Sequence, residues 1–211
     1  KLDTYLDGNK EGLSYRKLPM KVGHREKFWH KNCVVLGLAQ GFLEPLEASS
    51  ILLTDFAANF LADRFPKSKA DMAGLEKRFN HVMGYAWDRV VDFVKLHYCI
   101  SDRTDSQFWL DNKKPETIPE TLKERLALWQ QFTPQKEDFF SKFEVFDYDN
   151  YLYLLYGMDF NTKLAVKDAN YRHNAEQHAQ NIVDMSKQLN NALPNHRELI
   201  NKIKQYGMQP L

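Results

Sequence analysis

Apolar residues recur at steps of three and four over most of the chain after Glu44, and this pattern predicts helices. Pro45 is placed where the first turn of a helix tolerates proline, so we expect a first long helix from Glu44 to Pro66. A second is expected from about Ala70 to Tyr98. Its apolar stripe comprises Leu75, Phe79, Val82, Ala86, Val90 and Phe93.

The rest of the C-terminal part is also expected to be mainly helical. Polar residues and a proline predict a loop over Ser101–Ile118, and a helix is expected over Glu120–Phe132. Glu137–Tyr156 is dense in aromatic residues and is interpreted as mixed helix and loop. The polar tail, Asp168–Tyr206, is predicted to be helical and divided at Pro194.

The first 43 residues have a different pattern. Tyr15–Val22 alternates in part between apolar and polar residues, which predicts a short strand. Cys33–Ala39 is continuously apolar, as in a strand buried on both faces. Two strands alone are marginally stable, so we interpret them as the last strands of a sheet completed outside this chain. The predicted fold class is therefore mainly α with a short β segment at the N-terminus.

Composition excludes several classes of protein. Of 211 residues, 43% are hydrophobic and 27% charged, which suits a folded domain rather than a disordered one. Lys and Arg number 29 against 28 Asp and Glu, which gives no electrostatic case for a nucleic-acid or membrane-surface partner. Cys33 and Cys99 are too few for a disulfide framework, which favours a cytoplasmic location. No set of His, Cys, Asp and Glu has metal-ligand spacing, so no metal site is expected.

The segment richest in chemical information is Asn32–Ile51, NCVVLGLAQGFLEPLEASSI. Glycines at 37 and 41 allow the backbone to approach another group closely, and the following helix N-terminus favours an anion. Glu44 and Glu47 fall in that first turn. From the residues alone, ordinary helix capping is favoured over a carboxylate that acts as a base.

This segment resembles the second signature region of the flavin-dependent tryptophan halogenases. A W-x-x-N-C string begins at Trp29, and G-L-A-x-G-F-x-E-P-L-E runs from Gly37 to Glu47. Further matches follow in order at Phe65-Pro66, Phe79-Asn80, Asp92-Phe93, His97-Tyr98, Arg103, Asp105 and Phe108-Trp109. The resemblance implies the C-terminal part of an FAD-dependent monooxygenase/halogenase-like α+β fold. In it, residues 1–43 would end a flavin-binding sheet and residues 44–211 would form a helical substrate-side domain.

The resemblance also implies an activity. Members of the family use reduced FAD and O2 to oxidise a halide ion, and the product halogenates an indole or similar electron-rich aromatic. Glu47 matches the glutamate that assists this electrophilic step, so it is the expected catalytic residue. The expected partners are a small aromatic substrate and a separate flavin reductase that supplies the reduced FAD.

Further site residues follow from the same resemblance. The backbone N–H groups of Ser49 and Ser50 match those that hold the halide. Gly37 and Leu38 would lie by the ribityl chain of the flavin, and Ser50 and Ile51 against the edge of its ring. Related hydroxylases carry Asp at the position of Leu38, so this leucine favours a halogenase.

Some family features have no counterpart here. G-x-G-x-x-G, W-x-W-x-I-P and the catalytic lysine belong to the N-terminal half of the family, so we expect a missing FAD-binding half and an inactive fragment. Tryptophan halogenases clasp the free amino acid with a Tyr pair, a Glu and a Trp. Phe146 falls near the Trp position and the other residues find no match, which favours a substrate other than free tryptophan.

Alternatives remain open at this point for the activity, for His97 and for the polar tail. The protein could be a flavin monooxygenase-like relative that oxygenates an aromatic, or a non-catalytic helical module. His97 continues the apolar stripe after Phe93, and a core histidine with paired nitrogens is favoured over a ligand. The polar helix over Arg172–Asn191 is interpreted as an outer layer, with a homodimer contact as the lesser alternative.

Overall fold

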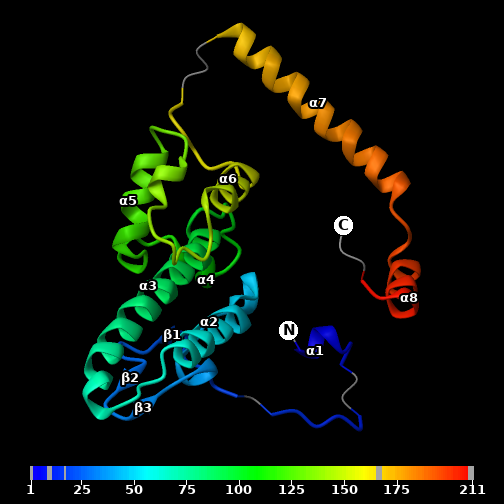
Figure 1. Ribbon diagram of the computed structural model, residues 1–211. Coiled ribbons are helices and arrows are strands. Elements are labelled where there is room, and N and C mark those ends of the chain that lie inside the picture. Colours follow the sequence, from blue (N-terminus) through cyan, green and yellow to red (C-terminus); the bar gives the residue numbers. More distant parts are fainter. Residues whose placement is uncertain (1, 9–10, 17, 165–167, 209–211) are drawn as a thin grey trace. The chain divides into compact units, whose positions relative to one another are not determined.

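The computed structural model describes residues 2–8, 11–16, 18–164 and 168–208 (Figure 1). The chain divides into two compact units, Lys1–Thr162 and Lys163–Leu211. The first contains the α-helices α1 (Leu2–Tyr5), α2 (Ser49–Asp63), α3 (Met72–Cys99), α4 (Gln107–Asn112), α5 (Glu120–Trp129) and α6 (Tyr148–Gly157). Its 3-10 turns are η1 (Gly37–Ala39), η2 (Pro45–Glu47), η3 (Lys69–Asp71), η4 (Pro115–Thr117) and η5 (Lys136–Asp138). The mainly α prediction is confirmed.

Among the described residues of the N-terminal part, the β segment consists of four two-residue strands: β1 (Gly23–His24), β2 (Trp29–His30), β3 (Cys33–Val34) and β4 (Gly41–Phe42). β1 pairs antiparallel with β4, and β2 with β3.

The strand predicted over Tyr15–Val22 is wrong, because the described residues of this range have no regular secondary structure. The strand predicted over Cys33–Ala39 is correct only at its first two residues, and Cys33 is exposed rather than buried. The reason is Gly37, whose φ of 59° turns the chain into η1. For Tyr15–Val22 the reason is different: alternating apolar and polar residues do not by themselves provide a neighbouring strand to hydrogen-bond with, and a strand requires one.

The core of the first unit is built around α3, its long central helix (Figure 1). The predicted stripe from Phe79 to Phe93 is buried, and Leu75 is half-buried at its start. α2 crosses this face, and Phe60 meets Phe79 edge-on with ring centroids 5.4 Å apart. Each fully buried large apolar side chain contributes about 1.5–3 kcal/mol. The helix predicted from Ala70 to Tyr98 is thus confirmed within two residues.

Asn80 connects the β segment to α3. Its side-chain oxygen accepts hydrogen bonds from the backbone N–H groups of Phe28 (2.7 Å) and Trp29 (2.9 Å). Its amide nitrogen donates to the carbonyl of Trp29 at 2.8 Å. One side chain therefore completes the pairing of a short strand that has few sheet partners.

A buried ion pair links α5 to the loop before α6. The Arg125 guanidinium lies 2.9 Å from the Glu144 carboxylate, and their side chains are 11% and 6% exposed. The hydroxyl of Tyr85 on α3 donates to the same carboxylate oxygen at 2.6 Å. These contacts hold the loop against α3 and place Phe146, which follows Glu144, on the core.

The second unit contains α7 (Ala169–Ala192) and α8 (His196–Tyr206). The side chains of Asp168 and Asn195 cap the two N-termini, and Pro194 lies between the helices as predicted. Across the described ranges, no helix is long and apolar enough to cross a membrane. The same residues contain no group of three or more His, Cys, Asp and Glu side chains that could hold a metal ion.

Candidate functional site

The site predicted from the sequence lies where η2 meets α2. Pro45 and Glu47 belong to η2, and Ala48 has a left-handed backbone with φ 50° and ψ 26°. α2 begins only at Ser49. The prediction that Glu47 lies in the first turn of the long helix is therefore wrong, because the left-handed residue ends one turn and redirects the chain before the next begins.

Glu47 pairs with His97, near the C-terminal end of α3. The distance between Glu47 Oε1 and His97 Nε2 is 2.7 Å, and the two side chains are 30% and 17% exposed. The other ring nitrogen, Nδ1, lies 2.8 Å from the carbonyl oxygen of Phe93. The prediction of a core histidine with paired nitrogens is confirmed for the pairing, although the ring is half-buried rather than buried. One of its partners is the expected catalytic glutamate. No pattern in the sequence indicates this contact.

The start of α2 has the features of an anion site. Ala48 precedes it without a side-chain cap, so the first N–H groups of the helix have no intrahelical acceptor. Ser49 is half-buried and Ser50 is exposed. The carbonyl oxygen of Ser50, in contrast to these N–H groups, has a partner: it accepts a hydrogen bond from the Thr54 hydroxyl at 2.8 Å. That these groups hold a halide stays a prediction.

The expected flavin-contacting residues gather on and against the first turns of α2. A Cβ added to Gly37 would lie 3.7 Å from Oγ1 of Thr54, so Gly37 packs against α2. Thr54 is one helical turn after Ser50. Leu38 is 72% exposed and Ile51 is 83% exposed. Two large apolar side chains with such exposure give a surface that an isoalloxazine ring or another part of the protein could cover.

Gln40, which sequence reasoning missed, fixes the turn that carries Gly37 and Leu38. It is fully buried, and its amide donates to the carbonyl of Val35 at 3.0 Å. Its oxygen accepts from Trp87 Nε1 of α3 at 3.2 Å. The position is the variable one of G-L-A-x-G-F, so the motif gives no signal for it.

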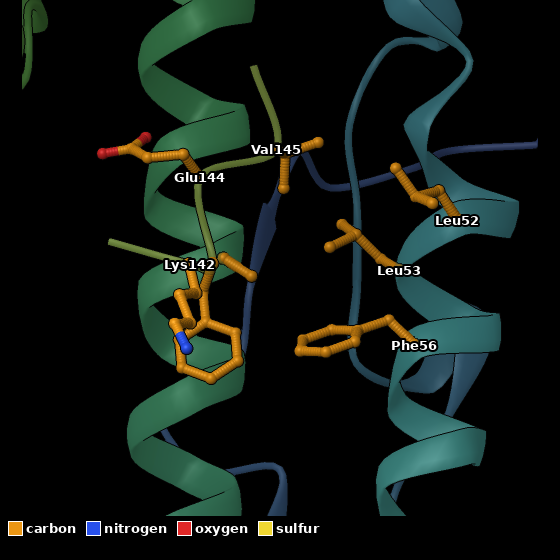
Figure 2. A pocket seen from close by; sticks show the side chains of 8 residues that line it. Leu52, Leu53, Phe56, Lys142, Glu144 and Val145 are labelled. Atoms are coloured by element: carbon orange, nitrogen blue, oxygen red, sulfur yellow. The ribbon is translucent and has the colours of Figure 1, made fainter. Parts of the chain in front are cut away.

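An apolar cavity of about 180 Å³ lies between α2, α3 and the segment 142–145. Figure 2 shows Leu52, Leu53 and Phe56 of α2 facing Val145, while the carboxylate of Glu144 points away from them. The rings of Phe56 and Phe143 are 5.8 Å apart. The cavity walls are therefore largely hydrophobic.

Phe146, which fell near the tryptophan of the family's clasp, lies in the core. It is 9% exposed and stacks on Phe93 with ring centroids 4.0 Å apart. Tyr151 meets Phe93 edge-on at 4.8 Å. These two aromatic residues therefore belong to the core, whereas Phe140 and Tyr153 of the same region are 85% and 82% exposed.

A family model for tryptophan halogenases matches residues 1–173. The chain belongs to the tryptophan halogenase family. The resemblance drawn from the signature segment is thereby confirmed.

Curated relatives in the family are 27% and 32% identical to the chain over the residues that align. A 7-chloro-L-tryptophan 6-halogenase from Kutzneria sp. (strain 744) is 27% identical over 190 residues, which are 88% of this chain and 36% of the relative. A tryptophan 6-halogenase from Streptomyces toxytricini is 32% identical over 138 residues, which are 65% of this chain and 26% of the relative. The chain thus spans about a third or less of the length of these curated relatives.

Solved halogenase structures share the fold. A tryptophan halogenase from Shewanella frigidimarina NCIMB 400 matches with a TM-score of 0.84 and 34% identity, over 100% of this chain and 41% of that one. A flavin-dependent halogenase from Brevundimonas sp. BAL3 matches with a TM-score of 0.72 and 31% identity, over 89% and 38%. The fold described above is therefore a portion of the halogenase fold.

Proposed function

We propose that this chain is the substrate-side portion of a flavin-dependent halogenase that acts on an indole or similar electron-rich aromatic. Family membership supports the reaction class. The observation that carries the proposal is Glu47 itself. Two features support its role: Glu47 of the signature E-P-L-E lies in the turn directly before α2, and its Oε1 is 2.7 Å from His97 Nε2.

The residues present fit a flavin. Gly37 and Leu38 form a turn against α2, and Ser50 and Ile51 are exposed on its first turn, so these four would hold the cofactor. When bound, reduced FAD supplies the two electrons with which O2 becomes the oxidant of the halide. We propose that a separate flavin reductase delivers it and that an N-terminal half completes its site.

The chain's own groups then serve the halogenation step. The N–H groups of Ser49 and Ser50 attract halide through the partial positive charge of the helix terminus. As hypohalous acid reacts, a carbon–halogen bond forms, the oxygen–halogen bond breaks and hydroxide leaves. Glu47 accepts the proton that the ring carbon loses and passes it to the hydroxide, so the products are the halogenated aromatic and water.

Replacement of Glu47 by Gln tests this proposal. In the full-length protein, Glu47→Gln should slow halogenation of indole by about 10²–10⁴-fold, the usual loss for a group that transfers a proton. Binding of FAD, measured by flavin fluorescence, should stay nearly unchanged, since Glu47 is not among the flavin-contacting residues.

A matched control is Asp55→Asn on α2. The carboxylate of Asp55 is exposed and accepts a hydrogen bond from Asn59 of the same helix. This variant should halogenate at the wild-type rate. A loss below twofold in Glu47→Gln would remove Glu47 from the mechanism.

A further inference from the structure

The imidazole of His97 is held on two sides, and the two contacts determine where its protons lie. Nδ1 faces the carbonyl oxygen of Phe93 at 2.8 Å. A carbonyl oxygen only accepts hydrogen bonds, so Nδ1 carries the hydrogen. The assignment leaves Nε2 to the other partner, Glu47.

One proton lies between His97 Nε2 and Glu47 Oε1, which are 2.7 Å apart. If Nε2 carries it, the pair is an imidazolium and a carboxylate, and if Oε1 carries it, a neutral imidazole accepts from a carboxylic acid. Both forms make a short, strong hydrogen bond that restricts the carboxyl group. In both, Oε2 is the oxygen left for the substrate.

The ring of His97 is itself well anchored. Phe93 meets it edge-on at 5.1 Å, and Phe93 is itself stacked on Phe146 with ring centroids 4.0 Å apart. Glu47, by contrast, lies in a three-residue turn with its side chain 30% exposed. A glutamate in such a turn would otherwise sample several rotamers, and ordering it during the reaction would cost free energy.

We propose that His97 is the positioning residue for Glu47, so that α3 sets the direction of the carboxylate. This inference rests on the proposed function. It predicts that the bond from residue 97 to Glu47, rather than the presence of an imidazole, is what the reaction needs.

Two substitutions separate the two contacts of the ring. The amide nitrogen of Gln reaches the place of Nε2, so His97→Gln keeps a donor to Glu47. Asn reaches the place of Nδ1, so His97→Asn keeps the contact with Phe93 and loses Glu47. In the full-length protein with indole as substrate, the kcat of His97→Gln should stay within about threefold of the wild-type value, because Gln keeps the hydrogen bond to Glu47. His97→Asn should lose about 10²-fold in kcat with little change in KM, the scale of a misplaced reacting group.

A double-mutant cycle decides whether His97 acts through Glu47. In the Glu47→Gln background, His97→Asn should cause no further loss, because the group that it positions is already disabled. Equal losses in both backgrounds, or a loss in His97→Gln as large as in His97→Asn, would overturn the inference. His81→Asn, an exposed histidine of the same helix, is the matched control and should leave the rate unchanged.

Folding and function are separated in the same experiment. Thermal unfolding of each variant shows whether a loss of rate reflects a loss of structure, and His97→Gln decides the question if His97→Asn does not fold. A wild-type protein that yields no halogenated aromatic would overturn the proposed function and the inference with it. A wild-type protein that halogenates, with additive losses in the cycle, would overturn the role of His97 alone.

Discussion

His24 on β1 is a residue whose charge contributes to stability. Its Nε2 lies 3.1 Å from the Asp88 carboxylate on α3, and its ring stacks with those of Phe28 and Trp87. The hydrogen bond with Asp88 raises the pKa of His24 above its usual value, against the opposing effect of burial. Because the folded state favours the protonated ring, this stabilisation is fully present below about pH 6.5 and is lost as pH rises through the folded-state pKa.

We therefore expect Asp88→Asn to destabilise the protein at pH 5.5 more than at pH 8.5. The difference should be about 1 kcal/mol or less, since the Asp88 side chain is 58% exposed and solvent screens it. Thermal unfolding midpoints of both proteins across this range are the measurement. Identical pH dependence in wild type and variant would show that the pair adds nothing.

At the residue scale, the sequence identified candidate site residues, but it did not identify the side chains with which they pair. Glu47, Ser49 and Ser50 came from a motif, because spacing and charge alone favoured ordinary capping for the glutamate. The bond from Glu47 to His97 depends on how α3 passes η2, and no local pattern encodes it. Gln40 was missed for the same reason, since both of its partners come from the fold.

Among the elements, the pairing of β1 with β4 depends on a glycine. A Cβ at Gly41 would lie 2.7 Å from both the Gly23 carbonyl oxygen and His24 Cβ, and backbone cannot move aside cheaply. Gly41→Ala should therefore lower the free energy of unfolding by about 1–3 kcal/mol, as overpacking usually does. Gly74→Ala on α3, where a Cβ meets nothing within 4 Å, is the control and should be neutral or stabilising. Equal stability of the two variants in urea unfolding would contradict the pairing.

The attachment of β2 to α3 makes a second prediction at this scale. Asn80→Ala removes three hydrogen bonds and leaves backbone groups of Phe28 and Trp29 without partners. An unsatisfied buried group costs about 1–3 kcal/mol, so the midpoint of thermal unfolding should fall markedly. Asn59→Ala, which removes only an exposed bond to Asp55, should change it little. A similar fall in both variants would show that the attachment of β2 is unimportant.

The elements that the sequence predicted are those with long repeating patterns. α3 has 28 residues, so its apolar stripe repeats many times and its limits are clear. The strand expected over Tyr15–Val22 had only a few alternating positions, and pairing decides such a segment. η2 escaped prediction because a left-handed Ala48, rather than a glycine, separates it from α2.

For the whole molecule, we propose that the apolar cavity holds the aromatic substrate, and its surroundings then predict a preference among substrates. Its walls come from α2, α3 and the segment 142–145, while the Glu144 carboxylate points away and pairs with Arg125 (Figure 2). Lys142 also lines the cavity and can pair with a carboxylate, whereas the Glu144 carboxylate that would suit an ammonium group points away. An ammonium group buried without a partner costs several kcal/mol, while a bare aromatic gains from stacking and burial. We expect the full-length protein to modify free indole in preference to tryptophan when both are present at equal concentration. Equal or greater conversion of tryptophan would show that a clasp for the amino acid exists.

The measurement that tests the central claim most directly is the mass spectrum of the product. Full-length protein receives FAD, a flavin reductase, O2 and bromide, with indole as the aromatic. The account predicts a product that carries the bromine isotope pattern, that requires bromide and that is lost in Glu47→Gln. An oxygenated indole without bromine, formed at the same rate whether or not bromide is present, would contradict it.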